Sequence, residues 1–114
     1  MAQRPRKLTV SYSARASAAL QEIWEWNAER YGPNHADEYV AFLRHQTDNL
    51  STNHALGRVV PNRPDLRYIT ARKQSGGYAH VVVYWIVGGK IEVVHYFHTA
   101  QDWARKLGDT KGSD

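Results

Sequence analysis

Apolar residues recur over positions 14–31 with the period of an α-helix. At 3.6 residues per turn, one stripe about 100° wide is formed by Ala16, Leu20, Ile23, Trp24, Asn27 and Tyr31. Ser13 precedes the pattern and is a good N-cap, because its hydroxyl can accept a bond from a first-turn backbone N–H. Gly32 and Pro33 then follow in the order usual after a helix C-terminus. The pattern predicts a surface helix that packs through one face.

A second helical stripe begins almost at once. It consists of Ala36, Tyr39, Val40, Leu43, Thr47 and Leu50. We expect Asn34 to cap this helix, with Asp37 and Glu38 in its first turn, where the helix dipole favours negative charge. Because the link between the two helices is short, they should form an antiparallel hairpin. We expect the second helix to fade over residues 51–57 and a loop to span residues 57–64.

The last third of the chain has the residue types and the alternation of β-strands. Three strands are expected there and a short one near the N-terminus, at residues 66–73, 78–87, 90–97 and 7–13. Gly88 and Gly89 supply the positive φ angles that a two-residue hairpin turn requires. Residues 78–87 are apolar on both faces, which indicates a central strand.

These elements predict an α+β fold with the order β-α-α-β-β-β. The antiparallel helical hairpin packs on a small, mainly antiparallel sheet, which the first strand must also join. A short helix should follow from about Asp102. The length of 114 residues fits a single domain over residues 1–114, and we expect flexible tails at residues 1–6 and about 108–114.

Composition narrows the class of protein. Apolar residues make up 42% of the chain, which is typical of a globular protein. The chain has no cysteine, so disulfides and thiolate metal sites are excluded. The opening "MAQRPRKLTV" lacks the apolar run of a signal peptide, and no apolar stretch is long enough to span a membrane. We therefore expect a soluble, cytoplasmic protein.

Positive charge is concentrated in one window. The chain has 15 basic and 11 acidic residues, a net charge of +4. Residues 58–73 hold five basic residues and one acidic residue, which accounts for the whole excess; the basic ones are Arg58, Arg63, Arg67, Arg72 and Lys73. Such a cluster suits an acidic partner, either nucleic acid or an acidic protein surface. A solvated loop and strand edge is the simpler interpretation, and patterning alone does not decide between them.

The histidines are the first candidates for chemistry. His95 and His98 are three residues apart, so on a strand they point to opposite faces and should not share a metal ion. We expect no metal site. His98 lies where the last strand ends, and Asp102 follows four residues later, an arrangement that would suit general acid–base chemistry. The simpler interpretation is that Asp102 turns or caps the chain without catalysis.

Basic residues and a tryptophan are the other candidates. A nuclease that works without metal needs an acid, a base and cations, and Arg67, Lys73 and His98 are the set that could supply them. Their spacing does not distinguish them from an ordinary basic sheet edge. Trp26 falls on the flank of the first helix beside Arg30, away from the centre of the apolar stripe, and a half-exposed tryptophan there suggests an interface.

Several strings in this order carry a resemblance to a known family. They are "SARASAALQEIWEWNAERYGPNHADEYV", "DLR" and "GYAHVVVYWIVGGKIEVVHYFHTAQDW". The marks are the spacing of Ala16, Leu20, Ile23 and Trp24, the Tyr31-Gly32 break, the Ala36 to Tyr39 start, Leu66-Arg67, the Tyr78 to Tyr84 strand, and His98 with Asp102. From about Val10 to Trp103 the chain resembles the ParE/RelE superfamily of toxins from bacterial type II toxin–antitoxin modules.

The resemblance implies one of two activities. RelE-like members are ribosome-dependent mRNA endonucleases that use basic residues on the sheet and an Arg and a Tyr near the C-terminus. ParE-like members lack that set and poison DNA gyrase. Here no Tyr follows Trp103, and Ala100 stands where ParE-like sequences usually have the Arg of His-x-Arg-x-Asp. The long Trp-rich hairpin also resembles ParE, so we favour a ParE-like gyrase inhibitor. An mRNA endonuclease is the alternative, and Ala100 leaves open an attenuated member that only binds an antitoxin.

The resemblance also implies partners. A ParD-like antitoxin should neutralise the toxin by laying an amphipathic, acidic segment across its sheet and helices. DNA gyrase is the expected target, or the ribosome with mRNA in the alternative, and a homodimer is left open. No cofactor is expected. The residues that we expect to bind target or antitoxin are Trp26, Arg30, Arg63, Arg67, Arg72, Lys73, His98, Asp102 and Trp103.

Overall fold

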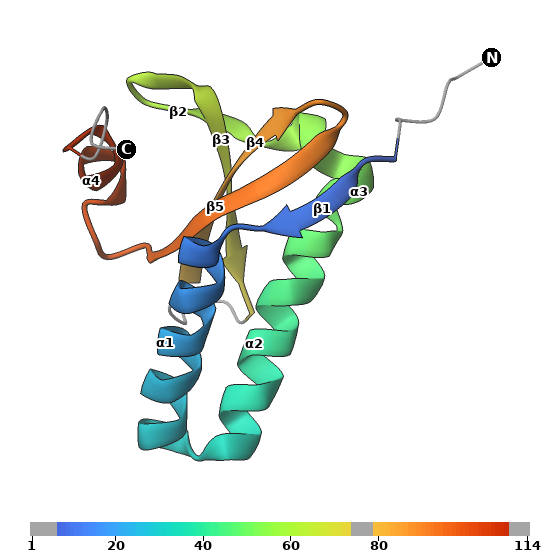
Figure 1. The fold of residues 1–114 in the computed structure, drawn as a ribbon. Coiled ribbons are helices and arrows are strands. Elements are labelled where there is room, and N and C mark those ends of the chain that lie inside the picture. The colour runs from blue at the N-terminus through green and yellow to red at the C-terminus, as the bar shows by residue number, and fades with distance from the viewer. Residues whose placement is uncertain (1–6, 74–78, 110–114) are drawn as a thin grey trace.

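A helical hairpin packs against a five-stranded sheet in this computed structural model, which describes residues 7–73 and 79–109 (Figure 1). The elements in chain order are β1 (Thr9–Tyr12), α1 (Ala14–Tyr31), α2 (Pro33–Asp48), α3 (Leu50–Asn53), the 3-10 turn η1 (His54–Leu56), β2 (Arg58–Val60), β3 (Arg63–Arg72), β4 (Ala79–Val87), β5 (Lys90–His98) and α4 (Trp103–Asp109). The predicted α+β class with a mainly antiparallel sheet is confirmed. Of the flexible tails expected at residues 1–6 and about 108–114, residues 108 and 109 belong to α4, and the rest lie outside the described residues.

The sheet has the order β1-β5-β4-β3-β2, with β1 parallel to β5 and every other pair antiparallel. The prediction that the first strand joins the sheet is therefore confirmed. β4 is central, and Val81 to Tyr84 are fully buried on both faces of it. Gly88 and Gly89 have φ angles of 58° and 78°, as the predicted hairpin turn requires.

α1 starts as predicted. Ser13 Oγ accepts a 3.0 Å bond from the Ala16 N–H and donates a 3.0 Å bond to the carbonyl of Val94 in β5. One side chain therefore both caps the helix and fixes its start against the sheet.

The predicted cap of the second helix is wrong. α2 begins at Pro33, with Gly32 at the N-cap and φ of 93°, so Asn34 lies inside the helix. A proline is favoured at the first helical position because its fixed φ suits the helix and its missing N–H would be unbonded there anyway. The shift also moves Asp37 out of the first turn, and its carboxylate instead accepts a 2.8 Å bond from Trp24 Nε1 across the hairpin.

The predicted loop over residues 57–64 is also wrong. β2 occupies Arg58–Val60 and pairs with β3, which begins at Arg63 rather than at residue 66. A three-residue strand is too short to show alternation, and Pro61 and Pro64, which follow it, are typical of a loop. Edge strands are protected from pairing with other chains when they are short, irregular or followed by proline. β2 has all three features, with a register shift after Val59 and a proline at position 61.

Helices pack on both faces of the sheet. The α1–α2 hairpin buries one face, where Leu20 and Leu43 pack on Val82 and Tyr96. α4 covers part of the other face through Leu107, which packs among Val81, Val83 and Phe97. The C-terminal half of β5 thus lies between α1 and α4, and the candidate site is built there. Across the described part of the chain, no helix has the length and apolar character needed to cross a membrane.

Candidate functional site

The structure separates the three residues of the predicted nuclease set. Arg67 lies opposite Tyr84 on β4, whereas His98 lies opposite His80. This offset of four residues corresponds to about 13 Å along the sheet. Arg67 is half-buried, and its Nη1 donates a 2.9 Å bond to the Gly57 carbonyl. It therefore holds the start of β2 in place rather than facing the end of β5.

Of the other basic residues of the window, Arg58 lies on β2, Arg63 and Arg72 lie at the two ends of β3, and Lys73 follows β3. Arg63 donates two bonds to the Asp65 carboxylate, at 3.1 and 3.0 Å, which offset its charge locally. Arg72 and Lys73 are exposed at the end of β3. They share that end of the sheet with His98, but β4 lies between the two strands. The window gives a basic sheet end rather than a compact catalytic cluster.

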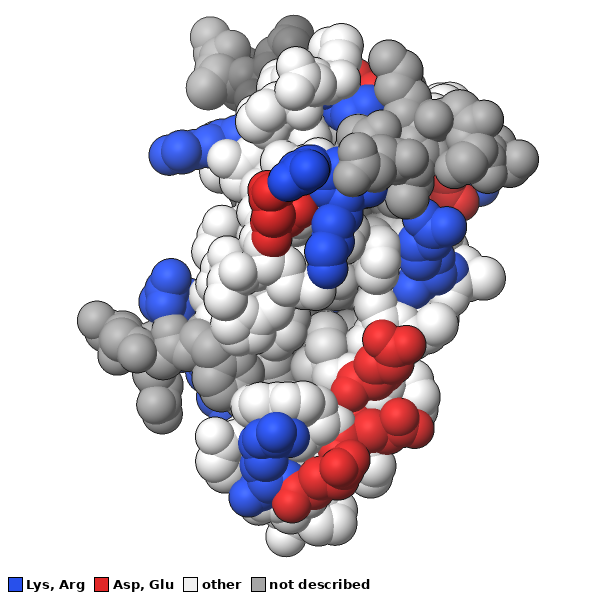
Figure 2. All heavy atoms as spheres, turned by 90° about the vertical axis from the view of Figure 1, so that its left-hand side faces the viewer, with Lys and Arg blue, Asp and Glu red and all other residues white. Residues whose placement is uncertain are grey.

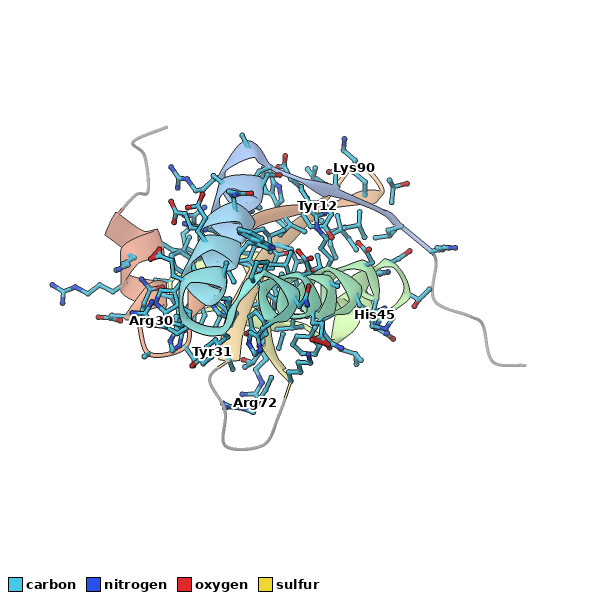
Figure 3. The ribbon with its side chains drawn as sticks, turned by 90° about the horizontal axis from the view of Figure 1, so that it is seen from below. Tyr12, Arg30, Tyr31, His45, Arg72 and Lys90 are labelled. Atoms are coloured by element: carbon cyan, nitrogen blue, oxygen red, sulfur yellow. The ribbon has the colours of Figure 1, made fainter. Side chains whose placement is uncertain are left out.

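Trp26 and Arg30 contact each other on the exposed side of α1. The Arg30 guanidinium lies over the Trp26 ring, 4.1 Å from its centroid, and Trp26 as a residue is 41% exposed. Figure 3, which looks at the molecule from below, shows Arg30 and Tyr31 at the tip of the hairpin, whereas Arg72 projects outward from the end of the sheet. The basic sheet end and the aromatic hairpin tip are thus two separate surfaces.

Trp103 and Asp102 belong to the start of α4. Trp103 packs edge-on against Tyr68, with the ring centroids 4.6 Å apart, so it anchors α4 on the sheet. Asp102 Oδ2 lies 3.9 Å from Arg105 Nη1, and both side chains are well exposed. Such an exposed pair contributes little to stability. The helix predicted from about Asp102 is confirmed as α4.

His95 and His98 point to opposite faces of β5, as predicted. His98 faces the hairpin side, where its ring lies 5.3 Å from that of His80, and His95 faces Phe97 at 4.2 Å. His95 Nδ1 accepts a 2.9 Å bond from the Tyr96 N–H. Burial, and then the charges of Arg15 and Lys106, lower the pKa of His95 to about 4. The ring is therefore neutral near pH 7, with its proton on Nε2.

His80 is a functional candidate that the sequence did not reveal. It is buried on β4, and its Nδ1 lies 2.6 Å from the Tyr39 hydroxyl of α2. Burial, and then the neighbouring His98, lower the pKa of His80 to about 4. Tyr39 was expected only as part of an apolar stripe, and no local pattern links it to a residue 41 positions away. Within the described ranges, no group of three His, Asp or Glu side chains is placed to hold a metal ion.

A groove of about 840 Å³ runs between α1 and α4 around the exposed side of β5. Its lining residues come from five segments, which are α1, β4, β5, the turn after β5 and α4. They are Arg15, Ala19, Glu22, Ile23, Trp26, Asn27, His80, His95, Tyr96, Phe97, His98, Gln101, Lys106 and Leu107. The groove follows the strand edge, so His95 and His98 both line it although they lie on opposite faces. This volume is within the range of ligand and peptide pockets. Of the predicted site residues, the groove brings together Trp26 and His98.

The turn after β5 contributes Gln101 to the lining of the groove. Gln101 Oε1 accepts a bond from the His98 N–H, and His98 Nδ1 accepts one from the Ala100 N–H. These bonds hold the turn without help from the side chain of Ala100, which is exposed. The geometry offers a preformed surface with an apolar floor and charged walls, which suits binding.

Comparisons with known proteins agree on one family. Residues 10–103 match the family model described as the ParE toxin of the type II toxin–antitoxin system parDE. Toxin ParE1 of Mycobacterium tuberculosis is 35% identical over 97 residues, covering 83% of this chain and 93% of the relative. Toxin ParE1 of Caulobacter vibrioides is 26% identical over 96 residues, covering 84% and 94%. The solved structure of a chromosomal ParDE TA system from P. aeruginosa has the same fold, with a TM-score of 0.68, 18% identity and coverage of 82% of this chain and 97% of that chain.

Proposed function

Because this chain belongs to the ParE toxin family of type II toxin–antitoxin systems, we propose that it binds and inhibits DNA gyrase in the cytoplasm and that a ParD-like antitoxin neutralises it. Inhibition by binding requires surfaces rather than a catalytic centre. The observation that carries the choice of mechanism is the separation of Arg67 from Lys73 and His98, which share the other end of the sheet. A metal-independent nuclease needs its acid, base and cations around one phosphate, and Arg67 is instead bonded to Gly57 on another part of the sheet.

The acidic character expected of the antitoxin is supported by the charge of the toxin. The basic end of the sheet at Arg72 and Lys73 is exposed, and two further cations, Arg15 and Lys106, line the groove. A partner with acidic and apolar side chains would be complementary to both. Such complementarity speeds association and selects the correct partner.

Purified gyrase tests the proposed target. In a supercoiling assay, rising amounts of this chain should stop supercoiling or trap cleaved DNA, and an equimolar amount of antitoxin should restore activity. Full supercoiling at a large molar excess of folded toxin would refute gyrase as the target.

Cleavage of ribosome-bound mRNA tests the enzymatic alternative in the same preparation. We expect no toxin-dependent cleavage. If cleavage occurs and is lost in His98→Ala or Lys73→Ala, the chain is a nuclease and the proposed mechanism is wrong. Normal growth of cells that express the chain without antitoxin would identify instead an attenuated protein that only binds its antitoxin.

A further inference from the structure

An apolar patch lies at the opposite end of the sheet from the groove. It consists of three exposed aliphatic residues, Leu56, Val59 and Ile86, whose exposed fractions are 77%, 51% and 40%. The groove meets β4 at His80, and Ile86 lies six residues farther along the same strand, about 20 Å away. Figure 1 shows α3 and the turn between β4 and β5 together at this end of the sheet. The patch is therefore a separate surface.

Two members of the patch lie on one face of the sheet, on either side of Arg67. Ile86 follows Tyr84 by two positions on β4, so both side chains lie on the face that the helical hairpin covers. Arg67 of β3 lies opposite Tyr84, and Val59 of β2 lies opposite Arg67. Two strand spacings therefore separate Val59 from Tyr84 on this face, a distance of about 10 Å.

Leu56 completes the patch as a projecting side chain. The turn η1 is held against β4, because the Tyr84 hydroxyl donates a 2.7 Å bond to the His54 carbonyl. Gly57 lies directly against the same hydroxyl. Leu56 lies between these two contacts on a fixed turn, yet it is largely exposed. A leucine that projects in this way is stabilised by entering a pocket of a partner, because its apolar surface then leaves water.

The charges around the patch are positive. On the face that holds the groove, by contrast, Figure 2 shows an acidic band over the lower part and basic side chains above it. Arg58 is exposed next to Val59 on β2, and Arg67 is half-buried opposite Val59. Within residues 7–73 and 79–109, neither arginine forms an ion pair, and Asp65, the carboxylate of β3, is paired with Arg63. An apolar pocket with carboxylates around it would be complementary to this surface.

These features distinguish between possible occupants. Nucleic acid bases stack on aromatic rings, which three aliphatic side chains do not provide. A second copy of the chain, related by a two-fold axis, would bring two sets of the same arginines together, and like charges repel. A strand of a partner is not expected to extend the sheet, because β2 is short and irregular at Val59. A folded protein with an apolar pocket and an acidic rim fits all of these features.

We infer, on the basis of the proposed function, that this patch is the surface through which the toxin docks on a gyrase subunit. Leu56 enters an apolar pocket of that subunit, and carboxylates of the subunit lie beside Arg58 and Arg67. An exposed apolar patch of this kind is typical of a protein–protein interface, and inhibition by binding requires such an interface with the target.

Supercoiling by purified gyrase gives the test. Leu56→Asp should raise the toxin concentration that halves supercoiling at least tenfold, because a carboxylate does not enter an apolar pocket. Leu56→Met keeps an apolar side chain of similar size and should stay within threefold of the wild type. Arg58→Glu should raise the concentration at least threefold, because it reverses the charge at the rim. Ala41→Asp adds a carboxylate at an exposed position on α2 and is the matched control, which should stay within twofold.

Two further measurements separate docking from folding. The dissociation constant of the complex with antitoxin, taken from the neighbouring reading frame, should stay within twofold of the wild type in each variant. The reason is that the patch lies apart from the groove and from the basic end of the sheet, the two surfaces that complement the antitoxin. A photo-reactive phenylalanine analogue in place of Leu56 should crosslink to a gyrase subunit, and the same analogue in place of Ala41 should not.

The outcomes that overturn the inference differ from those that overturn the proposed function. If the wild type inhibits gyrase and Leu56→Asp inhibits it equally, the patch is not the docking surface, while the proposed function stands. If Leu56→Asp stays folded by circular dichroism but loses antitoxin, the patch belongs to the antitoxin and the inference is wrong. It is also wrong if the wild type sediments as a dimer that Leu56→Asp dissociates. If the wild type does not inhibit gyrase, the proposed function fails and the inference fails with it.

Discussion

At the scale of single residues, Gly57 is fixed by a close approach to Tyr84. The Tyr84 hydroxyl donates a 2.7 Å bond to the His54 carbonyl, and a Cβ added at Gly57 would overlap that hydroxyl. We predict that Gly57→Ala lowers the free energy of unfolding by about 1–3 kcal/mol, the usual cost of overpacking, as measured by urea denaturation. Tyr84→Phe should cost about 1 kcal/mol through the lost hydrogen bond. Because it removes the overlapping oxygen, it should also lessen the added cost of Gly57→Ala. A variant Gly57→Ala as stable as the wild type would contradict the packing at this site.

The two neutral histidines of the groove predict sensitivity to acid. The folded-state pKa of both His80 and His95 is about 4, below the unfolded value of about 6.5. As the pH falls, His80 and His95 are therefore protonated at a higher pH in the unfolded chain than in the folded protein. Stability should be fully present above about pH 6.5 and should decline between about pH 6.5 and 4. Urea titrations across this range measure the slope. His80→Gln should lower the stability at pH 7 but flatten the slope, and an unchanged slope would show that His80 does not titrate differently on folding.

At the scale of elements, sequence periodicity predicts the hairpin and the three long strands because each has enough residues to repeat its pattern. The sequence does not predict β2, because three residues are too few to repeat a pattern. It misplaces the start of α2, because both Pro33 and Asn34 are suitable residues for the beginning of a helix. The groove is not predicted from the sequence for a different reason. Arg15, His80 and Lys106 lie on three elements, and only the packing of α1 and α4 on either side of β5 brings them to one surface. Of the residues that line the groove, the sequence identifies Trp26 and His98 as candidates.

The junction of α1 with β5 should contribute measurably to stability through Ser13. Ser13→Ala removes both the cap of α1 and the bond to Val94. It should lower the free energy of unfolding by about 1–2 kcal/mol and speed hydrogen exchange in the first turn of α1. Ser17→Ala is the matched control, because this exposed serine lies on the same helix outside the cap. Equal stabilities of the two variants would show that the cap contributes nothing measurable.

For the molecule as a whole, the basic end of the sheet has an uncharged residue, Ala100, in the turn that follows β5. The Thr99 N–H bonds to the Ala79 carbonyl, and Ala79 lies opposite Arg72, so position 100 adjoins the basic end. The side chain of Ala100 is exposed, and the turn is held by backbone groups and by His98 and Gln101. A longer side chain can therefore be added there without disturbing the fold.

The ParE resemblance places an arginine at this position, which makes Ala100→Arg a test of how this surface sets toxicity. We predict that Ala100→Arg inhibits gyrase at lower concentration and reduces colony counts at least tenfold further than the wild type. Its free energy of unfolding should stay within about 0.5 kcal/mol of the wild type, as is usual for surface substitutions. Ala18→Arg, at an exposed position on α1, adds the same charge elsewhere and should leave inhibition unchanged. If both variants inhibit alike, net charge rather than the sheet end governs the interaction, and the arginine of related toxins has a role that this surface does not share.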